Sequence, residues 1–117
     1  MDSRRQVLET YFDAFRRSDH AAVLGCLTDD VVWNVHGVRT THGKAEFDTE
    51  IENPDFEGSP VLREDRIVSE GDVTIVTGTG RGTHRQSGPF AFAFATAFTF
   101  RGDLITQVES YVAPVAS

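Results

Sequence analysis

The chain has 117 residues, of which 39% are hydrophobic and 25% are charged, and its formal net charge is −7 at pH 7. These values are typical of one globular domain with a single core, and the acidic balance argues against nucleic acid or an anionic membrane as a partner. A single cysteine cannot form an internal disulfide, and no apolar run approaches the length of a membrane span, so we expect a cytoplasmic protein.

The first element along the chain is an amphipathic helix. Apolar residues recur at helical spacing over 7–15, and Ser3 with Gln6 forms a capping-box signature before them, which predicts about four helical turns. Asp19 is the expected N-cap of a short second helix. Cys26 falls on an apolar helix face, so we interpret it as a buried structural thiol.

A strand, a third helix and four further strands follow. The stretch 29–37, "DDVVWNVHG", is rich in β-branched and aromatic residues and predicts a strand, whereas 41–54, "THGKAEFDTEIENP", predicts a helix that stops at its Asn-Pro end. The later strands are predicted at 61–70, 72–84, 89–101 and 103–112. Tight turns at 70–72 and 102–103 pair them into hairpins. This order predicts an α+β domain with helices packed on one face of a curved sheet.

The stretch 89–100, "PFAFAFATAFTF", alternates bulky and small residues. Its even positions from 90 to 100 are Phe except for Thr96, and its odd positions from 91 to 99 are Ala or Thr. Because side chains alternate across a strand, one face is aromatic and has to be buried, while the other is small. Thr96 is the one hydroxyl among the rings, and a buried hydroxyl needs a partner.

Four stretches, "YFDAFRRSDHAAVLGCLTDDVVW", "HGKAEF", "EGD" and "AFTFRGDLITQVESYV", carry a resemblance to a known family. The chain resembles the SnoaL-like branch of the nuclear-transport-factor-2-like, or ketosteroid-isomerase-like, superfamily over nearly its whole length. The resemblance implies that 1–117 form a single SnoaL-like domain. It implies a cone-shaped curved antiparallel sheet wrapped around helices, with an internal apolar pocket.

The resemblance also implies which residues line that pocket. On the strands, its register turns Phe94 and Thr96 inward, together with alternate residues of the two neighbouring strands. The expected ligand-binding residues are Phe15, Trp33, Phe47, Ile51, Thr77, Thr79, Arg81, Phe94, Thr96, Gln107 and Tyr111. In this register Glu109 also faces the pocket, where the alternative is a structural ion pair with Arg81.

The opposite face of the sheet is expected to be nearly featureless. We expect it to carry Gly78, Gly80 and Gly82 together with the alanines of 91–97. Such a surface lets a second sheet approach closely, and many members of the family that the chain resembles are homodimers. A homodimer through this Gly/Ala face is therefore the expected assembly, with an exposed small-residue face as the alternative.

Ketosteroid isomerases use a carboxylate base, a tyrosine and a protonated aspartate around the substrate carbonyl. Tyr11 matches the tyrosine, whereas Val35 falls at the base position and Thr96 at the aspartate position, so steroid-isomerase activity is not expected. The remaining catalytic candidates are Tyr11, Glu109 and His36, which lies next to the lost base position. The histidines show no metal-ligand spacing and no cofactor motif appears, so neither a metal nor a cofactor is expected.

Two classes of function stay open from these residues. The first is a cofactor-independent cyclase, isomerase or dehydratase that acts on a polyketide-like or aromatic apolar molecule by general acid/base chemistry. The second is a non-catalytic domain that binds a small apolar ligand or serves dimerisation. A free acid–base pair in the pocket favours the first class, and a Glu109–Arg81 ion pair beside a pocket filled by phenylalanines favours the second.

Overall fold

A computed structural model describes residues 3–58 and 60–115 of the chain. Helix α1 (Ser3–Arg16) buries one face, formed by Leu8, Tyr11, Phe12 and Ala14, as its hydrophobic spacing predicts. The hydroxyl of Ser3 donates to Asp103 at 2.8 Å and so ties the start of α1 to the turn before the last strand. Within the described residues no helix combines the length and the apolar character that crossing a membrane requires.

Two shorter helices follow α1. Helix α2 (His20–Leu24) is capped by Asp19, whose carboxylate accepts from the backbone N–H of Ala22 at 3.1 Å, which confirms the predicted cap. Helix α3 (Gly43–Asp48) is shorter than the predicted 41–54. The backbone N–H groups of Thr49, Glu50 and Ile51 each bond the carbonyl three residues earlier, so the helix ends in tight turns before the Asn-Pro pair.

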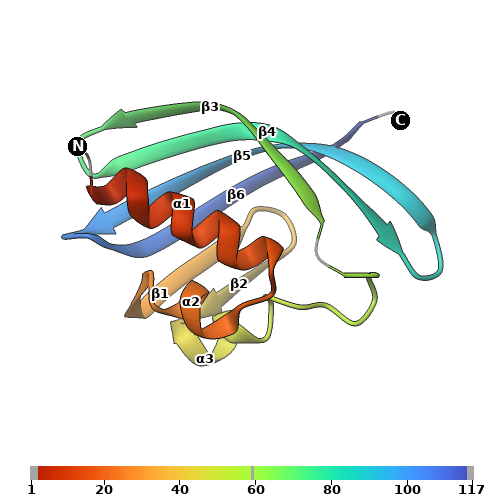
Figure 1. The fold of residues 1–117 in the computed structure, drawn as a ribbon, viewed down its shortest axis with the longest axis horizontal. Helices are drawn as coiled ribbons and strands as arrows, with labels where there is room; N and C mark the ends of the chain where they lie inside the picture. Colours follow the sequence, from red (N-terminus) through yellow and green to blue (C-terminus); the bar gives the residue numbers. More distant parts are fainter. Residues whose placement is uncertain (1–2, 59, 116–117) are drawn as a thin grey trace.

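The described strands form one six-stranded sheet in the order β2-β1-β6-β5-β4-β3 (Figure 1). The strands are β1 (Leu27–Val35), β2 (Arg39–His42), β3 (Val61–Glu70), β4 (Val73–His84), β5 (Gly88–Arg101) and β6 (Leu104–Val115). The pairing of β1 with β6 is parallel and the other pairings are antiparallel. The four long strands and their hairpins lie where the sequence predicts them, whereas β2 is an additional short strand.

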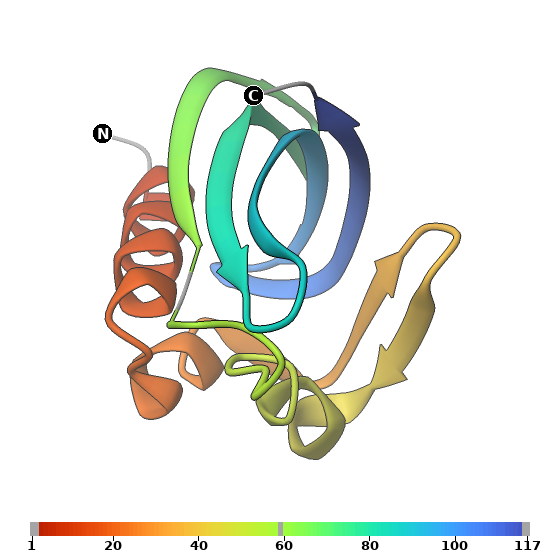
Figure 2. The same ribbon diagram turned by 90° about the vertical axis from the view of Figure 1, so that its right-hand side faces the viewer.

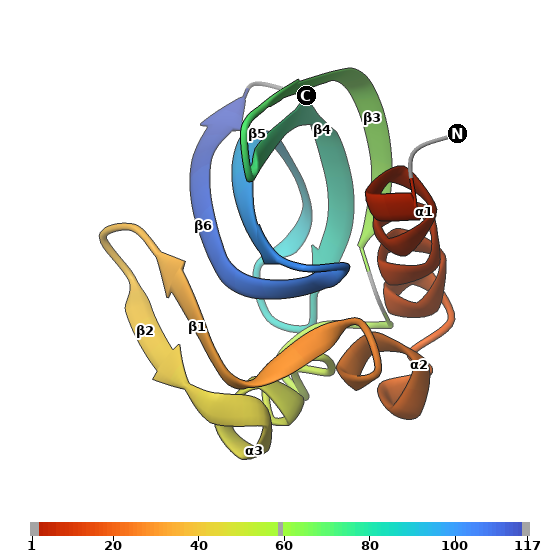
Figure 3. The ribbon, with the colours of Figure 1, turned by 90° about the vertical axis from the view of Figure 1, so that its left-hand side faces the viewer.

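The sheet is curled but not closed, which confirms the predicted cone-shaped α+β architecture. In Figures 2 and 3, β3–β6 curve strongly, α1 lies beside β3, and the β1–β2 hairpin projects from the other side. The core fills the concave side. There the ring of Phe98 on β5 contacts Tyr11 and Phe12 of α1, with centroid distances of 5.2 and 5.7 Å.

The glycines of β4 lie on the concave face and not on the outer face, which corrects the sequence prediction. Gly78, Gly80 and Gly82 stand directly opposite Phe94, Phe92 and Phe90 of β5, and residues directly opposite in a sheet share a face. A Cβ atom on Gly80 would lie 2.3 Å from the tip of the Phe92 ring. The rings therefore extend across the neighbouring strand, into space that only glycine leaves free.

The sequence prediction assigns the wrong set of alternating residues on β4 and β6 to the cavity. On both strands the residues that face inward are the neighbours of the predicted ones. Thr77, Thr79 and Arg81 alternate with the inward glycines of β4, so they face outward opposite Ala95, Ala93 and Ala91. The pairing of β5 with β6 shifts between Thr99 and Phe100 of β5, and at that point β6 carries one more residue than β5. Because the side-chain period is two, that residue turns Val108, Ser110 and Val112 inward and places Gln107, Glu109 and Tyr111 outside.

We expect Gly80→Ala to destabilise the fold by about 1–3 kcal/mol, because the new methyl group would overlap the Phe92 ring. The lower backbone entropy of alanine in the unfolded chain offsets only part of this cost. Chemical denaturation measures the change, and Thr79→Ala on the outer face of the same strand is the control, with an expected effect within about 0.5 kcal/mol. Equal stability of the two variants would contradict this account of the concave face.

Candidate functional site

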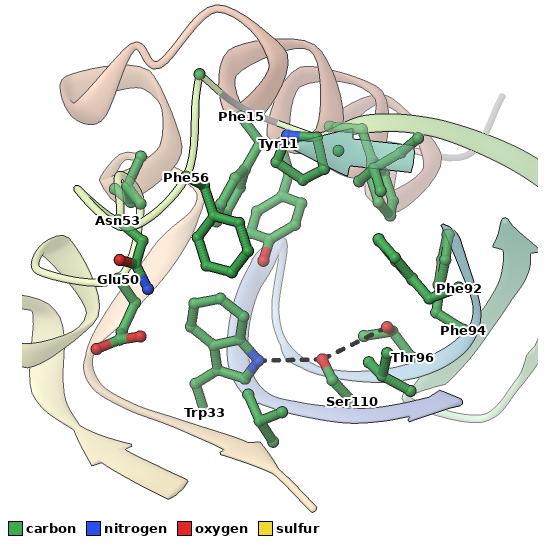
Figure 4. Close-up of a pocket in the computed structure, with 18 of the residues that line it drawn as sticks. Tyr11, Phe15, Trp33, Glu50, Asn53, Phe56, Phe92, Phe94, Thr96 and Ser110 are labelled. Atoms are coloured by element: carbon green, nitrogen blue, oxygen red, sulfur yellow. Dashed lines mark hydrogen bonds between the residues drawn. The ribbon is translucent and has the colours of Figure 1, made fainter. Parts of the chain in front are cut away.

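The concave side of the sheet encloses an open cavity of about 290 Å³ (Figure 4). Its walls come from the inner face of α1, from all six strands of the sheet and from residues between α3 and β3. Nine of the lining residues are aromatic: Tyr11, Phe12, Phe15, Trp33, Phe56, Phe90, Phe92, Phe94 and Phe98. This composition suits a flat apolar molecule.

The aromatic walls hold one another in place. Trp33 stacks on the fully buried Phe47 with a centroid distance of 4.7 Å and meets the edge of Phe15 at 6.0 Å. On β5, Phe90 and Phe92 stack at 5.9 Å above the glycines of β4. Because each ring is fixed by neighbouring rings or by the sheet, the cavity is preformed.

Tyr11 places a hydroxyl group at the cavity wall. Its side chain is only 4% exposed, and its ring is packed by Phe12, Phe15 and Phe98 with centroid distances between 5.2 and 5.4 Å. In Figure 4 the hydroxyl oxygen points toward Trp33 and the open space. Among the described residues the hydroxyl has no hydrogen-bond partner. Burial raises the pKa of Tyr11 far above its ordinary value, so the group stays protonated and can donate a hydrogen bond.

A second polar group lies on the sheet side of the cavity. The indole N–H of Trp33 donates to the Ser110 hydroxyl oxygen at 3.1 Å, and the Thr96 hydroxyl donates to the same oxygen at 3.5 Å. Thr96 and Ser110 are each 8% exposed and stand directly opposite each other on β5 and β6. The buried hydroxyl of Thr96 is thus satisfied by another hydroxyl and not by an acidic group.

The rim of the cavity carries its charged groups. Arg39 on β2 and Glu50 after α3 form an ion pair, with 3.2 Å between the arginine Nε and a carboxylate oxygen, and both line the cavity. The segment that carries Glu50 is anchored by His20, whose two ring nitrogens contact Asp48 and Glu52. The hydrogen bond to Asp48, followed by that to Glu52, raises the pKa of His20. His20 therefore ties this segment of the rim to α2, and the tie is stronger when its ring is protonated.

Six of the predicted site residues reach the cavity. They come from α1, β1, β5 and the turn after α3: Tyr11, Phe15, Trp33, Ile51, Phe94 and Thr96. Phe47 is fully buried behind Trp33 and does not line the cavity. These placements came from the resemblance to the family together with the helical and Phe-ladder patterns, because apolar spacing indicates which side of a helix or strand is buried.

The other predicted residues lie outside the cavity. Thr77, Thr79, Arg81, Gln107, Glu109 and Tyr111 are on the outer face of the sheet, and His36 follows β1 on the same side. His36 stacks on Tyr111 at 4.3 Å, and its Nε2 lies 3.6 Å from Glu109. Arg81 stands opposite Ala91 and Glu109 opposite Ala97, six residues apart on β5, so the considered Arg81–Glu109 ion pair does not form.

The sequence prediction missed the polar part of the site. Glu50, Arg39 and Asn53 come from a hairpin and a loop whose positions depend on long-range packing, and no local pattern places them at one cavity. Ser110 was missed because the register shift in the β5–β6 hairpin turns it inward. Within 3–58 and 60–115, no three His, Cys, Asp or Glu side chains lie close enough together to hold a metal ion.

A family model described as a SnoaL-like domain matches residues 8–108 of the chain. No curated protein matches the chain. Among solved structures, an NTF2-like protein of unknown function from Burkholderia pseudomallei is 23% identical and has a TM-score of 0.87, over 97% of this chain and 92% of that one. A protein from Xanthomonas campestris, named as a candidate polyketide cyclase, is 20% identical with a TM-score of 0.83, over 93% and 89% of the two chains. An LEH-like epoxide hydrolase from M. tuberculosis is 18% identical with a TM-score of 0.81, over 95% and 83%. At these identities the structures establish a shared fold.

Proposed function

Because the chain belongs to the SnoaL-like domain family, we propose that its cavity binds one compact, flat, apolar small molecule and that Tyr11 donates a hydrogen bond to an oxygen of that molecule. One observation carries the proposal: the hydroxyl of Tyr11, a residue that is 96% buried, faces an aromatic cavity and has no partner among the described residues. The hydroxyl opens onto the cavity, and a ligand that filled the cavity would bury it, where polar groups are nearly always hydrogen-bonded. A ligand oxygen would supply the missing acceptor.

The size of the cavity supports a small ligand. Ligand pockets usually measure roughly 300–1,000 Å³, and the cavity of about 290 Å³ lies at the lower end of that range. A molecule of two or three fused rings suits this volume and can stack on Trp33. Aromatic polyketides and related phenolic or ketone compounds belong to this class.

We expect 1-tetralone, a two-ring aromatic ketone, to quench the fluorescence of Trp33 saturably. Trp33 is the chain's single tryptophan and lines the cavity, so its emission reports binding directly. Tyr11→Phe should weaken tetralone binding roughly threefold to tenfold, the effect of one hydrogen bond. The affinity for tetralin, which has the same rings without the oxygen, should stay unchanged. Failure of both compounds to bind the wild-type protein would contradict the proposed function.

Catalysis is a second candidate function, and the Glu50 carboxylate at the same cavity favours it. Tyr11 would hydrogen-bond the carbonyl oxygen of a ketone while Glu50 takes a proton from the neighbouring carbon and returns it. The step is a proton shift that needs no cofactor, as an isomerase, a cyclase or a dehydratase acting on a polyketide-like substrate would use. Glu50 replaces Glu109 in this role because Glu109 lies on the outer face. The ion pair with Arg39 would have to open to free the base.

We expect the wild-type protein to accelerate deuterium exchange at the α-carbon of 1-tetralone in heavy water, measured by proton NMR. Glu50→Gln removes the proposed base and should slow the protein-dependent exchange about 10²-fold or more. Glu109→Gln, which changes a carboxylate outside the cavity, is the matched control and should exchange like the wild type. If Glu50→Gln exchanges as fast as Glu109→Gln, the cavity binds its ligand without acid/base chemistry.

We also propose that a second copy of the chain covers the outer face of β3–β6. This face exposes Tyr111 and Ile75 around the small alanines of β5. Arg81 lies toward one end of it and Glu109 toward the other, opposite Ala91 and Ala97. A two-fold arrangement would bring the cationic end of one copy to the anionic end of the other, so the face is complementary to itself.

Ala93 lies on this outer face, directly opposite Thr79 of β4. We expect Ala93→Arg to give a monomer in sedimentation velocity, because the arginine would separate the two sheets. Ala21→Arg, at an exposed position on α2, should sediment like the wild type. A wild-type protein that is already monomeric at micromolar concentration would contradict the dimer.

A further inference from the structure

Ser110 lies at the junction of three strands on the cavity wall. It stands opposite Thr96 of β5 on one side and Val35 of β1 on the other. Its side chain faces the concave side and is 92% buried, and it lines the same cavity as Tyr11. The hydroxyl is therefore removed from bulk solvent but adjacent to the space that a ligand would occupy.

The hydrogen bonds of this hydroxyl fix the direction of its proton. The indole N–H of Trp33 can only donate, so the Ser110 oxygen accepts that bond. The Thr96 hydroxyl donates to the same oxygen. A hydroxyl oxygen has two lone pairs and one proton, and the two incoming bonds engage the lone pairs. The Ser110 proton is left without an acceptor among the described residues.

Trp33 is fixed well enough to impose this direction. Its indole ring is stacked on the fully buried Phe47 and contacts the edge of Phe15, which restricts rotation of the ring. In Figure 4 the indole nitrogen faces Ser110, while the hydroxyl of Tyr11 reaches the same region from α1. Two elements from opposite sides of the cavity thus present hydroxyl groups whose protons no residue within 3–58 and 60–115 accepts.

We propose that Ser110 is a second hydrogen-bond donor to the ligand, positioned by Trp33, and that the cavity therefore selects compact aromatic ketones. The inference rests on the proposed ligand-binding function and names its ligand class. A ketone oxygen has two lone pairs and no proton, so it accepts from Tyr11, from Ser110 or from both. A hydrocarbon of the same shape leaves both donors without acceptors, and this difference makes the selection.

The experiment compares 1-tetralone with tetralin, which differ only in the carbonyl group, by isothermal titration calorimetry. Ser110→Ala removes the donor and should weaken tetralone binding roughly threefold to tenfold while leaving the affinity for tetralin unchanged. Trp33→Phe keeps an aromatic ring but loses the N–H that orients Ser110. It should therefore lower the ratio of tetralone to tetralin affinity in the same direction. Ser87→Ala, at an exposed position of the β4–β5 turn, is the matched control.

The outcomes separate this inference from the proposed function. Absence of binding by either compound to the wild-type protein overturns the proposed function and the role of Ser110 with it. Binding of both compounds, with Ser110→Ala weakening them equally or not at all, overturns the donor role alone and leaves the cavity as an apolar binding site. Thermal unfolding of each variant shows that the fold is kept. The inference is supported if Ser110→Ala unfolds at the same temperature as the wild type and loses affinity for tetralone but not for tetralin.

Discussion

The close contact between phenylalanine rings and glycine backbone on the concave face is the constraint on which the rest of the structure depends. Phe90, Phe92 and Phe94 each lie across a glycine of β4, and a Cβ atom at any of the three glycines would come within 3.0 Å of the facing ring. The rings can therefore lie along the sheet surface and leave space in front of them. That space, closed by α1 and the segment after α3, is the cavity.

The polar groups of the cavity are few and differ in how they are satisfied. Thr96 and Trp33 use their protons on Ser110, and Arg39 and Glu50 neutralise each other at the rim. Tyr11 and Ser110 keep protons that no described residue accepts. In a buried apolar site such groups make a large energetic difference between a ligand that carries an acceptor and one that does not. If the proposed function holds, the cavity selects a ligand loosely by shape and more strictly by whether it carries an oxygen acceptor.

A single register shift separates the expected inner face of β6 from the observed one. Without the extra residue in the β5–β6 hairpin, alternation would carry Gln107, Glu109 and Tyr111 into the cavity. With it, the cavity receives Ser110 and Val112, and Glu109 lies on the outside, 3.6 Å from the Nε2 of His36. The acid/base hypothesis consequently moves from a strand to the rim, where Glu50 is the carboxylate among the cavity-lining residues.

Local patterns in the chain were enough to predict the helices, the long strands and their hairpins, because helical spacing, strand alternation and Gly-Asp turns each act over a few residues. The family was predicted from the resemblance of four longer stretches. The resemblance to the family placed Tyr11, Trp33 and Thr96 at the cavity. The faces of β4 and β6, the end of α3 and the meeting of Arg39 with Glu50 were settled only when the chain folded. A bulge changes the alternation of every residue beyond it, and a rim built from separate segments forms only through packing between them.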